Sequence, residues 1–82
     1  MRRDPVPLAV ASERLGVREA TIRVWGTRYK VRKAKVLGVI YWDYVDLAAI
    51  DGYIHRGEPV PATPEERDRL REQRRTAYRD AA

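Results

Sequence analysis

The sequence predicts a mainly helical domain that carries one small β-hairpin and is followed by a charged helix. Apolar residues recur at helical spacings of three and four over residues 8–29 and 44–56. Between these segments the pattern becomes an alternation around a glycine, which is typical of a hairpin. A Thr-Pro-Glu-Glu sequence at residues 63–66 has the pattern of a helix start.

Composition narrows the functional classes. The 82 residues make one domain with a small core. The chain has no cysteine and one histidine, and it shows neither a nucleophile–base pair nor a phosphate-binding glycine loop. We therefore expect no enzymatic activity, no metal site and no cofactor. No run approaches the roughly 20 apolar residues of a membrane span, and there is no apolar export signal, so we expect a cytoplasmic protein without a membrane partner.

The whole chain has a net charge of +5, and its positive charge is concentrated in the first part of the sequence. Residues 1–35 hold ten basic side chains against three acidic ones, whereas residues 36–58 hold one against four. A concentrated positive charge attracts a polyanion. The distribution predicts double-stranded DNA or another nucleic acid as the partner, and no small-molecule ligand.

Residues 1–7 form a basic N-terminal arm. Pro5 and Pro7 keep it extended, and we expect it to be partly mobile. Arg2 and Arg3 are then either solvated or in contact with phosphates.

Two short helices follow the arm, with Gly16 between them. The first covers residues 8–15, and its inward stripe comprises Leu8, Ala11 and Leu15. Gly16 stands where a helix needs a left-handed cap. Arg18 begins the second helix, although a cation is unfavourable at the positive end of the helix dipole by up to about 1 kcal/mol. A phosphate bound by Arg18 would offset that cost.

The second helix has an apolar face and a polar face. The apolar face carries Ile22, Trp25 and Tyr29; the opposite face carries Ala20, Arg23 and Thr27, with Glu19 at its edge. The small side chains keep this surface slim enough for a DNA major groove, where Arg23 would reach a guanine edge and Glu19 a cytosine amine. The alternative is an ordinary amphipathic helix with a solvated face. We expect Gly26 to end or loosen the helix.

The hairpin is predicted as two strands, at residues 33–36 and 39–42, around Leu37-Gly38. Ile40 and Trp42 share a face and are expected to pack inward. Lys33 and Lys35 share a face of the first strand, as a wing along a phosphate backbone requires. The alternative is that they are edge-strand lysines that prevent sheet-to-sheet pairing.

Asp43 and Asp46 are expected to cap the third helix, which explains this acid pair better than acid–base catalysis does. The helix extends to about Arg56, and Gly57 ends it. Its expected core stripe is Leu47, Ile50 and Ile54, with Tyr44 and Tyr53 on the flanks.

Residues 58–63 are a Pro-rich linker, and residues 64–82 form the charged C-terminal helix, with Thr63 as its N-cap. The helix has few apolar residues and no heptad pattern. Either it is a solvated helix held by pairs such as Glu65 with Arg69, or Leu70 and Tyr78 contact a neighbouring protomer.

The order of elements resembles the winged helix-turn-helix of the MerR superfamily over residues 8–57. The residues that carry the resemblance are the Leu15-Gly16-Val17 turn, Thr21-Ile22-Arg23 with Trp25, Tyr41-Trp42-Asp43, and Asp46-Leu47. MerR regulators continue into a long dimerising coiled coil, whereas a short charged helix follows here. A small basic winged helix of this kind looks more like a phage excisionase, the factor that directs a phage integrase toward excision.

The resemblance implies a bacterial host cell, cooperative head-to-tail binding of protomers to tandem DNA sites, DNA bending and contact with the phage integrase. The residues expected on the groove-reading helix are Arg18, Glu19, Ala20, Thr21, Arg23 and Thr27. Those expected on the wing and its flanks are Arg28, Lys30, Arg32, Lys33 and Lys35. The alternatives are a small transcriptional repressor or activator, the DNA-binding part of a phage terminase, and a protein-interaction or antitoxin-like module.

Overall fold

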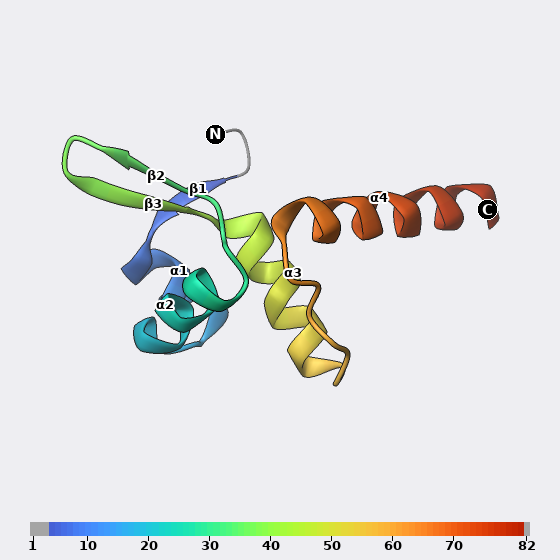
Figure 1. Cartoon of the computed structure of the whole chain (residues 1–82), viewed down its shortest axis with the longest axis horizontal. Helices are drawn as coiled ribbons and strands as arrows, with labels where there is room; N and C mark the ends of the chain where they lie inside the picture. The colour runs from blue at the N-terminus through green and yellow to red at the C-terminus, as the bar shows by residue number, and fades with distance from the viewer. Residues whose placement is uncertain (1–3, 82) are drawn as a thin grey trace.

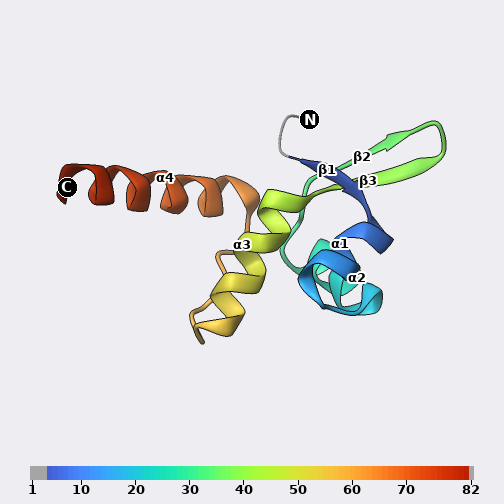
Figure 2. The same cartoon turned by 180° about the vertical axis from the view of Figure 1, so that it is seen from behind.

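The computed structural model describes residues 4–81 as a mainly helical domain with a small three-stranded antiparallel sheet. The elements are, in chain order, β1 (Pro5–Pro7), α1 (Leu8–Leu15), α2 (Glu19–Arg28), β2 (Lys33–Val36), β3 (Val39–Asp43), α3 (Tyr44–His55) and α4 (Pro64–Ala81). Helices α1 and α2 lie together against one side of the sheet, and α3 follows directly from β3 (Figure 1). Helix α4 extends away from the rest, on the far side of α3 (Figure 2). The molecule measures 44 × 26 × 21 Å.

The N-terminal segment is part of the sheet, which corrects the expectation of a mobile arm for residues 5–7. The strand order is β1-β3-β2, and Val6 pairs with Trp42 of β3. The Val6 side chain is buried in the core. Pro5 and Pro7 are tolerated because β1 is an edge strand, where a missing N–H costs no ladder hydrogen bond. Arg2 and Arg3 lie outside the described residues.

The core lies between the sheet and the first three helices. Its buried apolar residues are Val6, Ala11, Ile22, Trp25, Val31, Trp42, Leu47 and Ile50. Two core expectations are wrong. Ile40 is 47 % exposed because this part of the hairpin reaches beyond the helices, and Ile54 is 44 % exposed while Tyr53 is buried in its place.

The two strands and the turn of the hairpin lie where the sequence predicts them. Lys33 pairs with Trp42, and Val36 pairs with Val39. Both turn residues, Leu37 and Gly38, have positive φ angles, of 50° and 81°. This is the two-residue turn whose twist matches that of antiparallel strands.

Gly26 does not end α2, which continues to Arg28. It is buried, and a Cβ atom on it would lie 2.7 Å from Cζ3 of the Trp42 ring. Helix and hairpin therefore touch at a position where any side chain would collide with the indole. Close packing, and not helix termination, explains the glycine.

Asp43 caps α3 and Thr63 caps α4, as predicted, whereas the Asp46 carboxylate, expected to share in the cap of α3, binds Arg67 instead. The Asp46 N–H donates to Oδ1 of Asp43 at 3.1 Å, and the Glu66 N–H donates to Oγ1 of Thr63 at 3.3 Å. Gly57 follows α3 with a φ of 69°, which closes the helix end.

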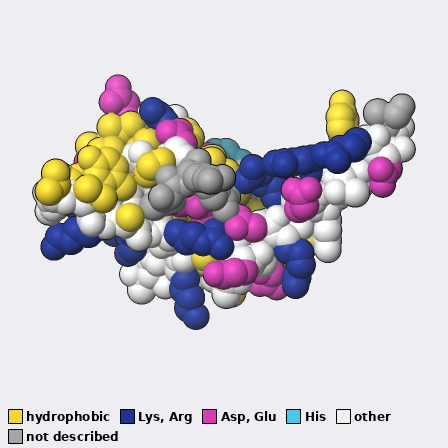
Figure 3. Space-filling view, turned by 90° about the horizontal axis from the view of Figure 1, so that it is seen from above, with side chains coloured by type: hydrophobic (Ala, Val, Ile, Leu, Met, Phe, Trp, Pro, Cys, Tyr) yellow, Lys and Arg dark blue, Asp and Glu magenta, His cyan; other side chains and the backbone are white. Residues whose placement is uncertain are grey.

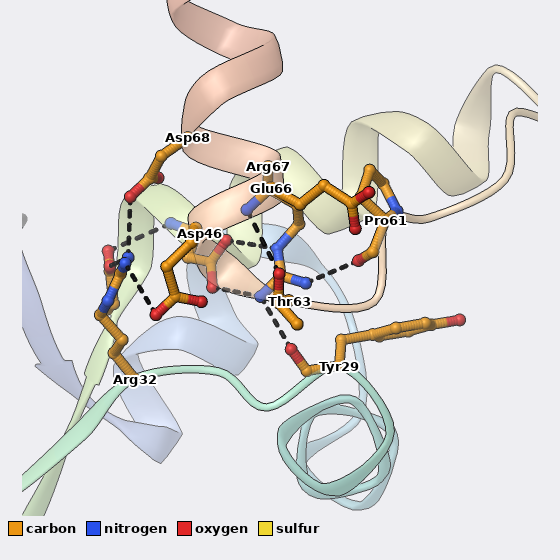
Figure 4. A network of polar contacts seen from close by, with 10 residues as sticks. Tyr29, Arg32, Asp46, Pro61, Thr63, Glu66, Arg67 and Asp68 are labelled. Atoms are coloured by element: carbon orange, nitrogen blue, oxygen red, sulfur yellow. Dashed lines mark hydrogen bonds and ion pairs between the residues drawn. The ribbon is translucent and has the colours of Figure 1, made fainter.

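A buried arginine attaches α4 to the domain (Figure 4). The Arg67 side chain is 1 % exposed, and its Nε and Nη2 atoms donate to the two carboxylate oxygens of Asp46, both at 2.6 Å. Its guanidinium also donates to the carbonyl oxygens of Pro61 (2.8 Å) and Tyr29 (2.9 Å). One side chain thus joins α4, the start of α3, the linker and the end of α2.

A second, partly exposed arginine also contacts the start of α4. Arg32 precedes β2, and its Nη1 atom donates to Oδ2 of Asp68 at 2.9 Å. Its Nη2 atom lies 3.6 Å from Glu65 of α4. The first turns of α4 are therefore fixed, although the remainder of the helix is exposed. Within residues 4–81 no helix is long and apolar enough to cross a bilayer.

Candidate nucleic-acid interface

The polar face predicted for α2 is a free surface. Glu19, Ala20, Arg23, Thr27 and the preceding Arg18 are exposed, whereas Thr21 is half-buried at the edge of the packed side. Val24 is 48 % exposed on the same helix, which the sequence analysis did not single out. With Ala20 and Thr27 as neighbours, Arg23 projects from a narrow surface.

The turn before α2 sets its direction. Gly16 has a φ of 66° and caps α1, and its N–H donates to the Ser12 carbonyl oxygen at 2.9 Å. The Ser12 hydroxyl donates to the carbonyl oxygen of Val17 at 2.6 Å, which closes the turn from the other side. Arg18 occupies the N-cap of α2 and forms no side-chain cap, as predicted. A phosphate at this helix end would meet free backbone N–H groups.

Arg23 is oriented by groups on its own helix. Its guanidinium lies 3.8 Å from Oε1 of Glu19, one turn before it. Both side chains are largely exposed, so this pair contributes little to stability. The pair places two hydrogen-bonding groups of opposite character side by side on the exposed face of α2.

The hairpin brings a lysine next to α2. Lys33 pairs with Trp42 in the sheet, so both side chains lie on the face that packs toward the helices. The Lys33 ammonium lies 4.8 Å from the centre of the Trp42 ring and 3.6 Å from the position of a Cβ on Gly26. Lys35 is exposed two residues further along the same face. Lys33 and α2 are therefore neighbours on one side of the molecule, and Lys35 lies further along the hairpin.

The cations between α2 and the hairpin do not all remain free. Arg28 and Lys30 are exposed. Arg32, which we expected on the wing flank, instead donates to Asp68 and holds α4. The fold places Asp68 and Glu65 of α4 within reach of Arg32, and their carboxylates balance its charge.

The outer face of the sheet is apolar, which the sequence analysis did not predict. Leu37 at the hairpin turn is 98 % exposed, and Val36 is 52 % exposed. Together with Pro5, Ala34 and Tyr41, Val36 lines a shallow groove of about 240 Å³. In Figure 3 this region is the hydrophobic patch at one end of the molecule, opposite the arginines of α4.

The two residues expected to contact a neighbouring protomer lie on α4. Tyr78 is 80 % exposed, and Leu70 is half-buried. The predicted pair of Glu65 with Arg69 is wrong, since Glu65 pairs with Arg32 at 3.6 Å and Arg69 pairs with Glu66 at 3.9 Å. Glu72 pairs with Arg75 on the same helix.

Among residues 4–81, no group of three His, Cys, Asp or Glu side chains is arranged to hold a metal ion.

Comparison of the chain with protein-family models, curated proteins and solved structures gives no match.

Proposed function

We propose that this protein binds double-stranded DNA in a sequence-specific manner, with α2 in the major groove and the hairpin lysines on the adjacent backbone. The observation that carries the proposal is the juxtaposition of Arg23, on a slim exposed helix face, with Lys33, next to Gly26 of the same helix. A groove-reading side chain and a phosphate-binding side chain then act from one side of the protein.

The arrangement of α1, α2 and the hairpin supports a winged helix-turn-helix of the MerR type as the finer description of the fold. Within that group we propose a phage excisionase, which binds tandem sites head to tail, bends DNA and contacts integrase. The exposed Tyr78, on a helix that extends away from its own domain, supports a contact between adjacent protomers. Bending a site costs about 1 to 6 kcal/mol, which several protomers offset more readily than one.

Arg23→Ala is expected to cost about 1 to 3 kcal/mol of specific DNA binding and to relax the sequence preference, because it removes a base contact. Lys35→Ala is the matched control, since it removes a phosphate contact. It should weaken binding on all sequences alike and lower the salt slope by about one. Fluorescence anisotropy on a selected site and on a scrambled duplex measures both effects. A uniform loss for Arg23→Ala would contradict its assignment as a base reader.

On DNA flanking an integrase gene, the protein is expected to form stepwise, cooperative complexes on direct repeats, with a bend that grows with each protomer. Gel-shift titration with circularly permuted fragments measures both. Tyr78→Ala should abolish the cooperativity and leave single-site binding intact, since the residue lies far from α2 on an exposed helix. A single unbent complex on a palindrome would contradict the excisionase proposal and indicate a transcriptional regulator instead.

A further inference from the structure

We propose that the cleft between α3 and α4 binds a phosphate group, and that it forms a second contact to a nucleic-acid backbone. Residues of α3 and α4 line the cleft, and α4 lies on the side of α3 away from the hairpin (Figures 1 and 2). The assignment of that nucleic acid as duplex DNA rests on the proposed function, whereas the phosphate chemistry rests on the cleft itself.

The floor of the cleft is made of small residues. Ala48, Ala49 and Gly52 of α3 leave a volume of about 180 Å³ between this helix and α4. A water molecule occupies about 30 Å³ in the liquid, so roughly six would fit. Such a space accommodates a compact anion that keeps part of its hydration.

The walls of the cleft carry arginines. Four guanidiniums line it, from Arg56, Arg67, Arg71 and Arg74. Two carboxylates oppose them, because Asp46 neutralises Arg67 and Glu58 is shared by Arg56 (2.6 Å) and Arg74 (3.5 Å). The group therefore retains two positive charges. Arg71 forms no ion pair with any residue of the described range 4–81.

The arginines are preorganised around an aromatic ring. The guanidinium carbons of Arg56 and Arg74 lie 5.2 and 5.3 Å from the centre of the buried Tyr53 ring. Contact with an aromatic face restricts the guanidinium while leaving its N–H groups able to donate. A planar fork of donors matches the oxygens of a phosphate.

Glu58 shows that an anion is stable beside this cleft, where it pairs with two of the lining arginines. Its backbone N–H donates to the Tyr53 carbonyl oxygen at 2.9 Å, so the chain fixes the residue beside the arginines. The Arg56 guanidinium lowers the pKa of Glu58, and the carboxylate is therefore ionised at neutral pH. A phosphate would share or displace it, which makes Glu58 an internal competitor.

The basic surface continues from the cleft along α4. At 100° per residue, Arg71, Arg74, Arg75 and Tyr78 fall on one face of the helix, and a continuous line of Lys and Arg side chains is visible along it (Figure 3). Successive turns repeat at about 5.4 Å, so the charges are spaced along a line. A row of guanidiniums that begins in a cleft favours an extended polymer of phosphates, because successive arginines can meet successive phosphates of one backbone.

Arg71→Ala is expected to weaken DNA binding on all sequences and to lower the salt slope by about one, because one phosphate contact is lost. Arg69→Ala is the matched control: it removes the same charge from the opposite face of the same helix, where Arg69 pairs with Glu66. Glu58→Gln should tighten binding by removing the competitor. Anisotropy across a salt series measures all three variants, and circular dichroism verifies that each is folded.

A nuclear magnetic resonance titration of the full chain with a short duplex separates this inference from the proposed function. The expected result is shifts at Tyr53, Arg71 and Arg74 as well as on α2. Shifts confined to α2 and the hairpin would overturn the inference and leave the proposed function standing. Shifts confined to the cleft would overturn the proposed function and leave the inference standing. Equal losses for the Arg71 and Arg69 variants would also overturn the inference. Larger chemical-shift changes in the cleft with a polyglutamate peptide than with the duplex would overturn the inference as well.

Discussion

Arg67→Ala is expected to lower the free energy of unfolding by about 3 to 5 kcal/mol, the usual cost of removing one partner from a buried ion pair. Asp46 has no exposed surface, so its carboxylate would be left charged and unpaired in the interior. The carbonyl oxygens of Tyr29 and Pro61 would each lose a charged donor. A domain of this size is stable by about 5 to 15 kcal/mol, so the substitution should remove a large part of that stability.

Urea denaturation followed by circular dichroism measures this loss, and Arg69→Ala supplies the control. The Arg69 side chain is 66 % exposed on the same helix, so its removal should change stability by no more than about 0.5 kcal/mol. The double variant with Asp46→Ala should be less destabilised than the sum of the two single variants, because neither charge is left alone. A loss below about 1 kcal/mol for Arg67→Ala would show that the pair is open to solvent in solution.

The sequence could predict the helices and, apart from the end of α2, where they begin and end, because those signals are local. Gly16 after the first helix, Asp43 before α3 and Thr63 before α4 each act through hydrogen bonds to backbone groups within a few residues. The polar face of α2 was predictable for the same reason, since its periodicity of 3.6 residues per turn is set by the helix itself. Arg23 is exposed as that pattern requires.

The long-range contacts were not predictable, because nothing in a local pattern distinguishes the residues that make them. Arg67 and Asp46 are 21 residues apart, and Arg67 has the sequence context of a solvated helix residue. Arg32 looked like a member of the basic wing, although Asp68 lies 36 residues further on and holds it. Val6 lies between two prolines, and only the edge position of β1 allows such a segment to be a strand.

Attachment of α4 determines the relation between the two proposed DNA-binding surfaces. Arg67 donates to the carbonyl oxygen of Tyr29 at the end of α2 and to Asp46 at the start of α3. The arginines of α4 therefore have a fixed position relative to the face of α2 that carries Arg23. A rigid connection of this kind allows one protein to constrain the path of a DNA molecule, because each surface must meet the backbone at a defined place.

Gly26→Val is expected to destabilise the fold by about 3 kcal/mol, the upper end of the usual cost of overpacking. The first added carbon would lie 2.7 and 2.8 Å from two atoms of the Trp42 ring. The indole is buried and cannot move aside without disturbing the sheet, where Trp42 pairs with both Val6 and Lys33. Thermal unfolding should show the loss, and Gly26→Ala should cost less, since one carbon collides and alanine favours a helix by about 1 kcal/mol.

Gly52 provides the control for this prediction, because it is the other glycine inside a helix. A Cβ there would lie 3.0 Å from the end of the flexible Arg56 side chain, which can move, so Gly52→Ala should stabilise the protein by up to about 1 kcal/mol. The double variant Gly26→Val with Trp42→Leu should be less destabilised than the sum of the two single variants, since the smaller side chain removes the collision. If Gly26→Ala instead stabilised the protein as Gly52→Ala does, helix and hairpin would not touch at Gly26. The position of Lys33 beside α2, on which the DNA-binding proposal depends, would then be wrong as well.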